Sequence, residues 1–409
     1  MFDFLPLLFL IGAAQGGFLA FALITSAGGN HKANYYLACY LLVFVMALID
    51  YFLDASGLTQ KIVWLRTLLW PKEFLYGVFL FLYCRELTQP NRPIPPSLAV
   101  VLWLPVVLHC CASWPLLWLP AELQYSILLN ERGLPPLYDA WRIMLGDLEL
   151  LVTIIHLSIF IVICLRLVTQ HRKRLESNYS NLDRISLIWL RNLLIGTMLV
   201  YGLWLAEEFF SADLLEGREW LDVTLAASMV ALIYTMGLLG LRQPAIFSTR
   251  SETSTHQRET APAWGSDGSH LHKVQQTPSL EKTLDPPSQK YQRSALSPEL
   301  ASSLVEELEA LMAAKFLFLD PNLSLSNLAQ ALSVSTNYLS QAINDQLKVN
   351  FFDCVNGYRV RHSLPLLAQS STTVLEIAMD SGFNSKSAFY TAFRKHQGMT
   401  PGAYRKQMA

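Results

Sequence analysis

The sequence predicts an all-α protein in three parts: a seven-helix transmembrane bundle at residues 1–242, a disordered linker at 243–296, and a small all-helical domain with two helix-turn-helix units at 297–409. Three observations predict this fold class. Hydrophobic residues make up 52% of the 409 residues and charged residues only 15%, against roughly 25% charged in ordinary soluble proteins. The hydrophobic residues form long runs before Gln243, whereas polar residues dominate after it. Helix start signals then return in the last part.

Seven apolar runs are long enough to cross a bilayer. An α-helix rises about 1.5 Å per residue, so about 20 apolar residues span roughly 30 Å of hydrocarbon. The predicted spans are Phe4–Thr25, Tyr35–Leu53, Thr67–Leu87, Ser97–Leu117, Ile143–Val168, Leu187–Phe210 and Val223–Leu241. Because the first run is too long for a signal peptide and no basic segment precedes it, we expect it to stay in the protein as a span.

Lysines and arginines in the loops predict the orientation of the bundle, because basic loops stay in the cytoplasm. The loop between the fifth and sixth spans contains Arg172, Lys173, Arg174 and Arg184. The next loop, at 211–222, has Arg218 alone. This pattern places the N-terminus outside and the C-terminal domain in the cytoplasm. Four basic residues in other loops favour the opposite orientation: Lys61, Arg66, Arg132 and Arg142.

Several ionisable residues interrupt the apolar spans. With the N-terminus outside, they fall in the outer third of four different spans. Ionisable groups in lipid are costly and usually face a cavity or one another, so we expect a polar pocket open to the outside. The candidate ligand-pocket residues are Asp50, Lys72, Glu73, Asp147 and Glu149. Glu207 and Glu208 lie near a span end, where they mark either this pocket or the membrane interface.

The segment 243–296 is rich in Pro, Ser, Thr and Gln and poor in aliphatic residues, so it cannot bury enough apolar surface to offset the entropy of ordering. We therefore expect a flexible linker, which transmits proximity between its ends but not a rotation or a piston movement. The six cysteines show no pairing pattern and no Cys/His metal spacing appears, so we expect neither a metal nor another cofactor.

The last part begins with a helix start signal. Ser297, Pro298 and Glu299 combine an N-cap, a proline at the first helical position and an acid in the first turn. The helix then carries an apolar stripe with coiled-coil spacing: Ala301, Leu304, Leu308 and Leu311. Two heptads are too few for a stable coiled coil alone. The stripe either packs on its own domain or pairs two chains in a homodimer.

Two pairs of short helices follow. In the first pair, Ser324 caps a helix, the turn SVS follows, and Ser335 caps a second helix whose apolar side, including Tyr338, we expect to face inward. In the second pair, Thr373 begins a capping box and Gly382 permits the left-handed turn before another capped helix. Each second helix presents a polar outer face. This is the plan of a helix-turn-helix, whose second helix enters the DNA major groove.

The stretches LSNLAQALSVSTNYLSQAIND, FFDCVNGYRV and VLEIAMDSGFNSKSAFYTAFRKHQGMTPGAYRK resemble the DNA-binding domain of the AraC/XylS family of bacterial transcription regulators. The resemblance covers residues 323–406. A helix at 351–367 would join the two units, so that one chain reaches successive major grooves about 34 Å apart. The base-reading residues implied by the resemblance are Asn337, Ser340 and Gln341 in the first unit and Lys386, Ser387, Tyr390 and Thr391 in the second.

Basic residues of this domain are expected at the DNA phosphates, which provide most of the binding affinity. They are Arg359, Arg361, Arg394, Lys395, Arg405 and Lys406. The sequence departs from the family pattern at two positions. Leu347 stands where the family usually has glycine, and Pro365 lies inside the joining helix, where it removes a hydrogen bond.

The seventh span has no lysine for a Schiff base, which disfavours a retinal photoreceptor. A transporter or membrane enzyme with a DNA-binding regulatory tail is the alternative, but no metal-binding helix motif, nucleophile elbow or phosphate loop appears. We therefore expect a non-enzymatic, one-component transcription regulator, anchored in the bacterial inner membrane, that senses a signal through its spans. Expected partners are double-stranded promoter DNA, the lipid bilayer, an unidentified small ligand and a second copy of the chain.

Overall fold

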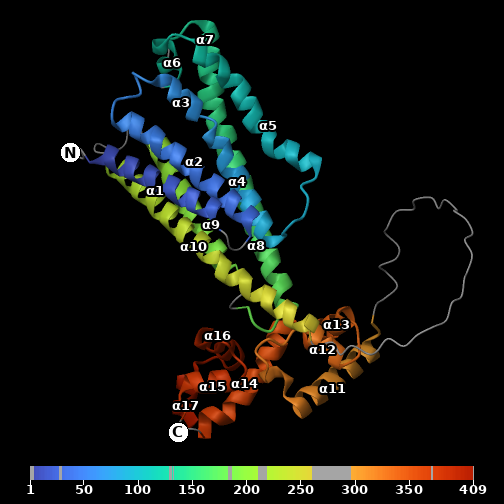
Figure 1. The fold of residues 1–409 in the computed structure, drawn as a ribbon. Coiled ribbons are helices and arrows are strands. Elements are labelled where there is room, and N and C mark those ends of the chain that lie inside the picture. The colour runs from blue at the N-terminus through green and yellow to red at the C-terminus, as the bar shows by residue number, and fades with distance from the viewer. Residues whose placement is uncertain are drawn as a thin grey trace, which may run out of the picture. The chain divides into compact units, whose positions relative to one another are not determined.

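The computed structural model describes residues 4–26, 30–128, 131, 133–182, 187–210, 219–259, 296–369 and 372–408. Throughout these ranges the regular structure is helical (Figure 1). One isolated antiparallel bridge, between Tyr179 and Ser324, is the exception. The predicted all-α class is therefore confirmed for the described residues. The chain divides into two compact units. The N-terminal unit comprises Met1–Arg172 and Leu187–Glu252, and the C-terminal unit comprises Lys173–Ser186 and Thr253–Ala409.

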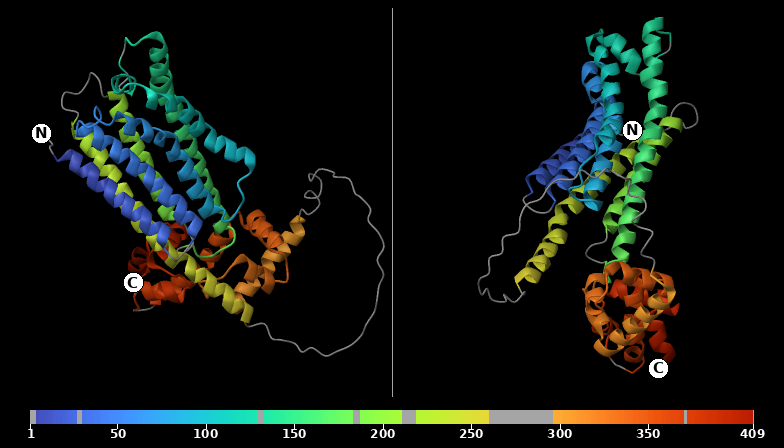
Figure 2. Two further views of the ribbon diagram at one scale, coloured as in Figure 1. Left: turned by 45° about the horizontal axis from the view of Figure 1, so that its top comes forward. Right: turned by 90° about the vertical axis from the view of Figure 1, so that its right-hand side faces the viewer.

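Long helices that pack side by side form the N-terminal unit (Figure 2). The helices are α1 (Leu5–Thr25), α2 (His31–Ala55), α3 (Val63–Leu69), α4 (Lys72–Thr88), α5 (Pro96–Ser113), α6 (Ala121–Leu128), α7 (Pro136–Ile143), α8 (Glu149–Glu176), α9 (Ile188–Phe210) and α10 (Glu219–Glu259). A 3-10 turn at Trp114–Trp118 follows α5, and a π turn at Met144–Leu148 joins α7 to α8. Buried side chains of α1, α2, α4, α5, α8, α9 and α10 form one continuous hydrophobic core.

Among the described residues, six helical stretches are long and apolar enough to cross a membrane, judged by length and composition. They are Leu5–Thr25, His31–Ala55, Pro96–Trp118, Pro136–Glu176, Trp189–Glu207 and Val223–Leu241. The prediction of one further span at Thr67–Leu87 is wrong as a single helix. Because Pro71 has no N–H to continue the hydrogen bonds of α3, the chain divides there into α3 and the 17-residue α4.

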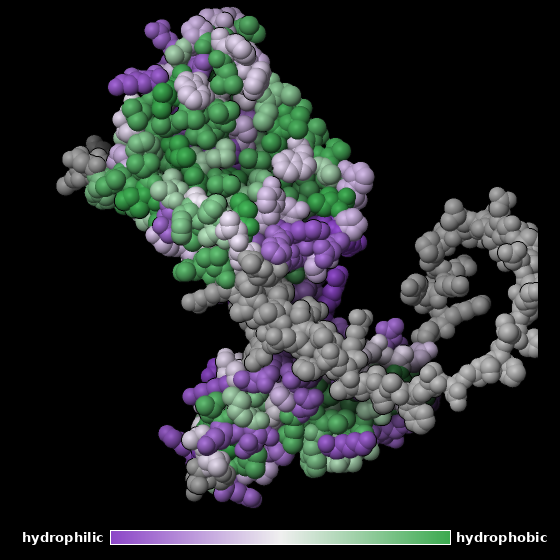
Figure 3. Space-filling view, viewed as in Figure 1, coloured by the Kyte–Doolittle hydropathy of each residue, from purple (hydrophilic) through white to green (hydrophobic). Residues whose placement is uncertain are grey.

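Large hydrophobic side chains cover the outside of the N-terminal unit. Figure 3 shows a broad hydrophobic face over its helices. Phe18 and Phe21 of α1 are 64% and 65% exposed, and Leu199 of α9 is 66% exposed. Continuous apolar surface of this kind is rare on soluble monomers and marks contact with lipid or with another protein.

Glycines allow three of these helices to approach closely. A Cβ at Gly16 of α1 would lie 2.7 Å from Cγ2 of Val45 on α2, and a Cβ at Gly237 of α10 would lie 2.5 Å from Cδ1 of Leu19 on α1. Any larger side chain there would require the facing side chain of Val45 or Leu19 to move or the helices to separate. Small residues at helix contacts are typical of membrane bundles, where close packing replaces the hydrophobic effect between helices.

The end of α10 differs from the predicted linker boundary at residue 242. The helix continues to Glu259, because a helix needs only local backbone hydrogen bonds and does not depend on the burial of its side chains in a core. A composition too polar for a core does not by itself end a helix. The rest of the predicted linker, at 260–295, lies outside the described residues.

The C-terminal unit contains α11 (Pro298–Lys315), the 3-10 turn Leu317–Leu319, α12 (Leu325–Ala331), α13 (Thr336–Leu347), α14 (Phe351–Gln369), α15 (Val374–Asp380), α16 (Lys386–Gln397) and α17 (Pro401–Met408). Two hydrophobic cores lie in this unit. The long helix α14 supplies Phe351 and Val355 to the first core and Val360 and Leu367 to the second, so it joins the two. α14 also runs through Pro365 without interruption.

The apolar stripe of α11 packs on its own domain. Ala301, Leu304 and Leu308 are buried in the first core, with Leu308 fully covered, and Leu311 packs against that core. The alternative of a coiled-coil contact between two chains is therefore wrong for this stripe. The same 3,4 spacing serves a coiled coil or an amphipathic helix, and here α13 and the rest of the domain cover the stripe.

Candidate functional site

Two helix-turn-helix units of matching construction lie in the C-terminal unit. Ser324 caps α12 by accepting a hydrogen bond from the Asn327 N–H at 3.2 Å. Thr373 caps α15 in a full capping box, in which its hydroxyl accepts from the Glu376 N–H at 3.2 Å and the Glu376 carboxylate accepts from the Thr373 N–H at 2.8 Å. These hydrogen bonds satisfy N–H groups that have no partner within the helix.

The turns of the two units share the same hydrogen bonds. In the first turn, Ser333 is left-handed with φ of 55°, and the Val334 N–H donates to the Ala329 carbonyl. In the second, Gly382 is left-handed with φ of 84°, and the Phe383 N–H donates to the Ala378 carbonyl. Glycine is required at the second turn for space as well, because a Cβ there would lie 2.6 Å from the carbonyl oxygen of Phe318.

The second helices, α13 and α16, have the same internal register with a shift of 50 residues. Their N-cap hydroxyls, of Ser335 and Ser385, accept from the N–H groups of Tyr338 and Ala388 at 3.2 and 3.1 Å. Leu339, Ala342 and Ile343 are buried in α13, and the equivalent Phe389, Ala392 and Phe393 are buried in α16. This register leaves equivalent polar positions of both helices at the surface.

The residues predicted to read bases lie on these outer faces. Asn337, Lys386, Ser387 and Thr391 are exposed, and Ser340, Gln341 and Tyr390 are half-buried. The Lys386 ammonium lies 5.4 Å from the centre of the Tyr390 ring. A cation over an aromatic face is held in place without losing its charge, so the first turn of α16 presents an oriented positive group.

Sequence reasoning placed Tyr338 and the family glycine position incorrectly. Tyr338 is 39% exposed on the outer side of α13, because its position corresponds to the half-buried Ala388 rather than to the buried Phe389. The residue equivalent to Gly398, the left-handed end of α16, is Lys348 with φ of 55°, and not Leu347. Counting from the caps Ser335 and Ser385, rather than matching hydrophobic letters, would have found both positions.

The predicted phosphate-binding residues separate into different environments. Arg361, Arg394, Lys395 and Lys406 are exposed, whereas Arg405 is half-buried. The Arg361 guanidinium lies 4.4 Å from the centre of the Tyr358 ring. Lys395 forms an ion pair with Asp353, with Nζ 2.6 Å from Oδ2. A phosphate that binds Lys395 would therefore compete with a carboxylate.

Arg359 is not accessible to phosphate, so the prediction for this residue is wrong. It is 1% exposed, and its guanidinium donates to the carbonyl oxygens of Phe318 and Asp320 at 2.7 and 2.8 Å. Burial lowers its pKa to about 10, with Asp320 acting in the opposite direction, so it is still a cation at neutral pH. The backbone carbonyls, which only the folded domain brings together, hold this charge inside.

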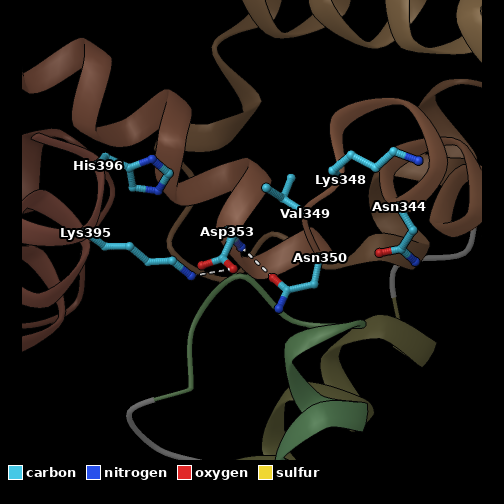
Figure 4. A pocket seen from close by; sticks show the side chains of 7 residues that line it. All are labelled: Asn344, Lys348, Val349, Asn350, Asp353, Lys395 and His396. Carbon is cyan, nitrogen blue, oxygen red and sulfur yellow. Dashed lines mark hydrogen bonds and ion pairs between the residues drawn. The ribbon is translucent and has the colours of Figure 1, made fainter.

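A polar pocket of about 640 Å³ opens between the two helix-turn-helix units, within the C-terminal unit (Figure 4). Its lining residues come from the end of α13, the start of α14 and the end of α16: Asn344, Lys348, Val349, Asn350, Asp353, Lys395 and His396. Burial lowers the pKa of His396; Asp353 opposes this shift, and Lys395 and Arg361 add to it. The pocket thus carries both signs of charge.

The N-terminal unit brings three of the five predicted pocket residues together. Lys72 Nζ lies 2.9 Å from Oδ2 of Asp50 and 3.0 Å from Oε1 of Glu73, and Lys72 is only 6% exposed. Arg66 joins this cluster, with Nε 3.0 Å from Oδ1 of Asp50. Sequence reasoning treated Arg66 only as a loop charge. We call these four residues the polar cluster.

The other two predicted residues lie on or near α8. Glu149 is buried, and its Oε1 lies 2.9 Å from Nδ1 of His109 on α5. The ring of Phe74 contacts His109 at 5.7 Å between centres and so links this pair to the helix of the polar cluster. The side chain of Asp147 lies outside the described parts of the structure. The partner His109 carried no sequence signal, because a lone histidine in an apolar helix has many roles.

The comparisons with known proteins agree with this geometry. Residues 328–407 match the family described as "Helix-turn-helix domain". The chain is 30% identical over 87 residues to the Melibiose operon regulatory protein of Escherichia coli (strain K12), over 21% of this chain and 29% of that protein. It is 31% identical over 88 residues to the uncharacterized HTH-type transcriptional regulator YtdP of Bacillus subtilis (strain 168), over 22% of this chain and 11% of that protein.

Among solved structures, the chain is similar to the C-terminal domain of AraT, a response regulator from Geobacillus stearothermophilus, with 29% identity and a TM-score of 0.23. The match covers 28% of this chain and 88% of the other chain. It is also similar to a protein of unknown function from Listeria innocua, with 28% identity and a TM-score of 0.24. That match covers 26% of this chain and 97% of the other chain. The chain spans less than a third of the length of the curated relatives above. The matches indicate a helix-turn-helix domain in residues 328–407.

Proposed function

We propose that this protein is a membrane-anchored, one-component transcription regulator of bacteria, in which residues 1–242 sense a signal and residues 297–409 bind promoter DNA. One observation carries the proposal: α13 and α16 present equivalent polar faces in one domain, in a chain whose other unit exposes large apolar side chains. Such a surface contacts lipid or another protein, and six apolar helical stretches of membrane-crossing length favour lipid. A transporter has no use for two DNA-reading helices.

The DNA would be read by both helix-turn-helix units. Each second helix would enter a major groove, with the two grooves about 34 Å apart. Lys386 and Gln341, with their polar neighbours on the same faces, would contact base edges. Arg361, Arg394 and Lys406 would contact phosphates, which position the domain without reading sequence.

The bundle would cross the inner membrane seven times, with the N-terminus outside and the C-terminal unit in the cytoplasm. The third crossing in chain order, added to the six long apolar stretches, is α4, whose 17 residues correspond to about 25 Å, near the short limit for a span. Neighbouring helices bury most of α4 from Gly77 onward, so it need not face lipid itself. Residues 243–296 would connect the two functions.

The signal would be recognised near the polar cluster. Four charged groups held within a mostly apolar bundle are costly and are retained where they bind or respond to something. Because Asp50 and Glu73 share one buried lysine, a small charged or strongly polar ligand fits this chemistry best. Asp147 and Glu149 would line the same region. A homodimer, if the active form, would need a surface other than the stripe of α11.

Two measurements test the proposal. The first maps DNA bound in cells by the full chain and by Lys386→Ala; we expect discrete sites that weaken in the variant, and binding without sequence preference would exclude a specific regulator. The second uses reporters that are active only in the periplasm. They should work when inserted at 211–222 and fail after Glu259, and the reverse result would place the DNA-binding unit outside the cell.

A further inference from the structure

A short segment between α8 and α9 belongs to the C-terminal unit. We call residues 177–182 the strap. The Ser180 N–H and hydroxyl both donate to the carbonyl oxygen of Leu323, at 3.2 and 2.6 Å. The carbonyl oxygen of Asn178 accepts from the Leu325 N–H at 2.9 Å. These bonds form the antiparallel bridge between Tyr179 and Ser324, so the strap pairs with the chain that enters α12.

Arg359 also holds the strap. Its guanidinium donates to the carbonyl oxygen of Ser180 at 2.9 Å and to its hydroxyl at 3.1 Å. Ser180 and Arg359 are each only 1% exposed. Paired backbone groups and a buried cation therefore hold the strap in one specific position on the domain.

The strap is an addition to the helix-turn-helix domain. The family match covers residues 328–407, whereas the strap lies well before it in the chain. Its placement also gives the domain a second connection to the bundle. The strap follows α8 directly, since α8 ends at Glu176, whereas the connection after α10 includes the long segment 260–295.

The strap lies at the helix that DNA would cross. The first helix of a helix-turn-helix crosses the DNA backbone. In the first unit that helix is α12, and the Leu325 N–H at its start is bonded to the Asn178 carbonyl of the strap. A DNA strand that crosses the start of α12 would therefore meet the strap.

The end of α8 adds a negative charge nearby. Oε2 of Glu176 accepts from the Asn350 side chain at 3.5 Å, and Asn350 lines the pocket shown in Figure 4 together with Asn344 of the outer face of α13 and Lys395. A carboxylate beside these residues opposes the approach of phosphate. The strap at the start of α12 and the Glu176 carboxylate both predict weaker DNA binding while the strap is docked.

We propose that the strap is an intramolecular competitor of DNA: strap and DNA exclude each other on the first helix-turn-helix unit, and the docked strap weakens DNA binding. This inference rests on the proposed function, because it makes α8 the membrane helix whose movement releases the strap. The signal then passes through the short connection after α8. The long linker does not need to transmit it.

A reversible lock tests the proposal in the full chain. Tyr179→Cys with Ser324→Cys places two thiols at the bridged positions, so oxidation should fix the strap in its docked state. The probe is a set of duplexes selected from random sequence by the reduced protein in detergent. We expect the oxidised protein to bind these duplexes at least about tenfold more weakly than the same sample after reduction. Each single-cysteine variant controls for oxidation of the six native cysteines.

A release variant tests the opposite direction. Ser180→Pro removes the N–H that donates to Leu323, and we expect it to bind the selected duplexes several-fold more tightly than the native chain. Ser177→Ala is its matched control within the strap, because the hydrogen bonds of the Ser177 hydroxyl, to the Arg174 carbonyl and from the Asn178 side-chain amide, are all local in the chain.

The outcomes are distinct. No disulfide, or equal binding before and after reduction, overturns the inference, as does weaker binding by a folded Ser180→Pro. The locked sample contains its own control for folding, since reduction should restore binding. If the reduced protein selects no sequence at all, the proposed function fails instead.

Discussion

Lys395 of α16 and Asp353 of α14 form an ion pair, with Nζ 2.6 Å from Oδ2, that links the second helix-turn-helix unit to the helix joining both units. Lys395 is 61% exposed and Asp353 is 14% exposed. The lysine is thus at the surface, while its carboxylate partner is held beneath it. This arrangement reduces the positive charge that the domain offers to DNA.

Removing that carboxylate should strengthen DNA binding. We expect Asp353→Asn to raise affinity for all duplexes and to increase the slope of log K against log salt by about one, because one more cation becomes available to a phosphate. The measurement is a salt titration of DNA binding by the full chain. Glu306→Gln, on the exposed side of α11, is the control for loss of one negative charge; equal effects of both changes would exclude a local role for Asp353.

Lys386 and Arg394 should differ in how they affect specificity. Lys386 begins α16 and is oriented by the Tyr390 ring, so Lys386→Ala should reduce discrimination between the best and random duplexes by about 1–3 kcal/mol. Arg394→Ala should weaken both kinds of duplex alike. Competition binding at fixed salt separates the two outcomes, and a uniform loss in Lys386→Ala would assign Lys386 to a phosphate.

The capping box of α15 predicts a pH dependence. Hydrogen bonds from the Thr373 N–H and hydroxyl lower the pKa of Glu376 below its ordinary value of 4.5. Because the folded pKa is the lower one, the stabilisation is complete above pH 4.5 and is lost as pH falls through the folded pKa. Hydrogen exchange of α15 amides in the full chain should therefore speed up in acid, beyond the intrinsic rate.

Two variants complete that test. Glu376→Gln should remove the additional acid sensitivity of α15, and Thr373→Ala should cost about 0.5–2 kcal/mol of local stability by loss of the cap. The amides of α13 in the same sample serve as the internal reference, because α13 has no acidic residue in its first turn. An unchanged acid profile in Glu376→Gln would show that another group is responsible.

Lys72 should be essential to the stability of the N-terminal unit. Lys72→Met leaves Asp50 and Glu73 without their shared cation, and removing one partner from a buried charge pair typically costs about 3–5 kcal/mol. The measurement is unfolding of the detergent-solubilised chain by denaturant. Asp54→Asn is the control, since Asp54 is 60% exposed and its pair with Arg66 should contribute less than about 1 kcal/mol; a similar loss in both variants would contradict burial as the cause.

The sequence by itself determined the features that depend on neighbours along the chain. Apolar runs of membrane length predicted the long helices, because hydropathy over a helix is a local sum. Caps and left-handed turns at Thr373 and Gly382 predicted the second helix-turn-helix unit, because capping joins residues only three positions apart. The repeat of this plan about 50 residues earlier predicted the first unit.

Only the tertiary structure decided which of the possible partners each side chain takes. Arg359 carries the same charge as an exposed arginine, but carbonyl groups from the turn before α12 and from the strap surround it. Asp50 and Lys72 pair because α2 and α4 pack together, and the stripe of α11 is covered by its own domain. Ser180 and Leu323 are 143 residues apart. Contacts over such distances depend on how whole helices pack, which no local pattern contains.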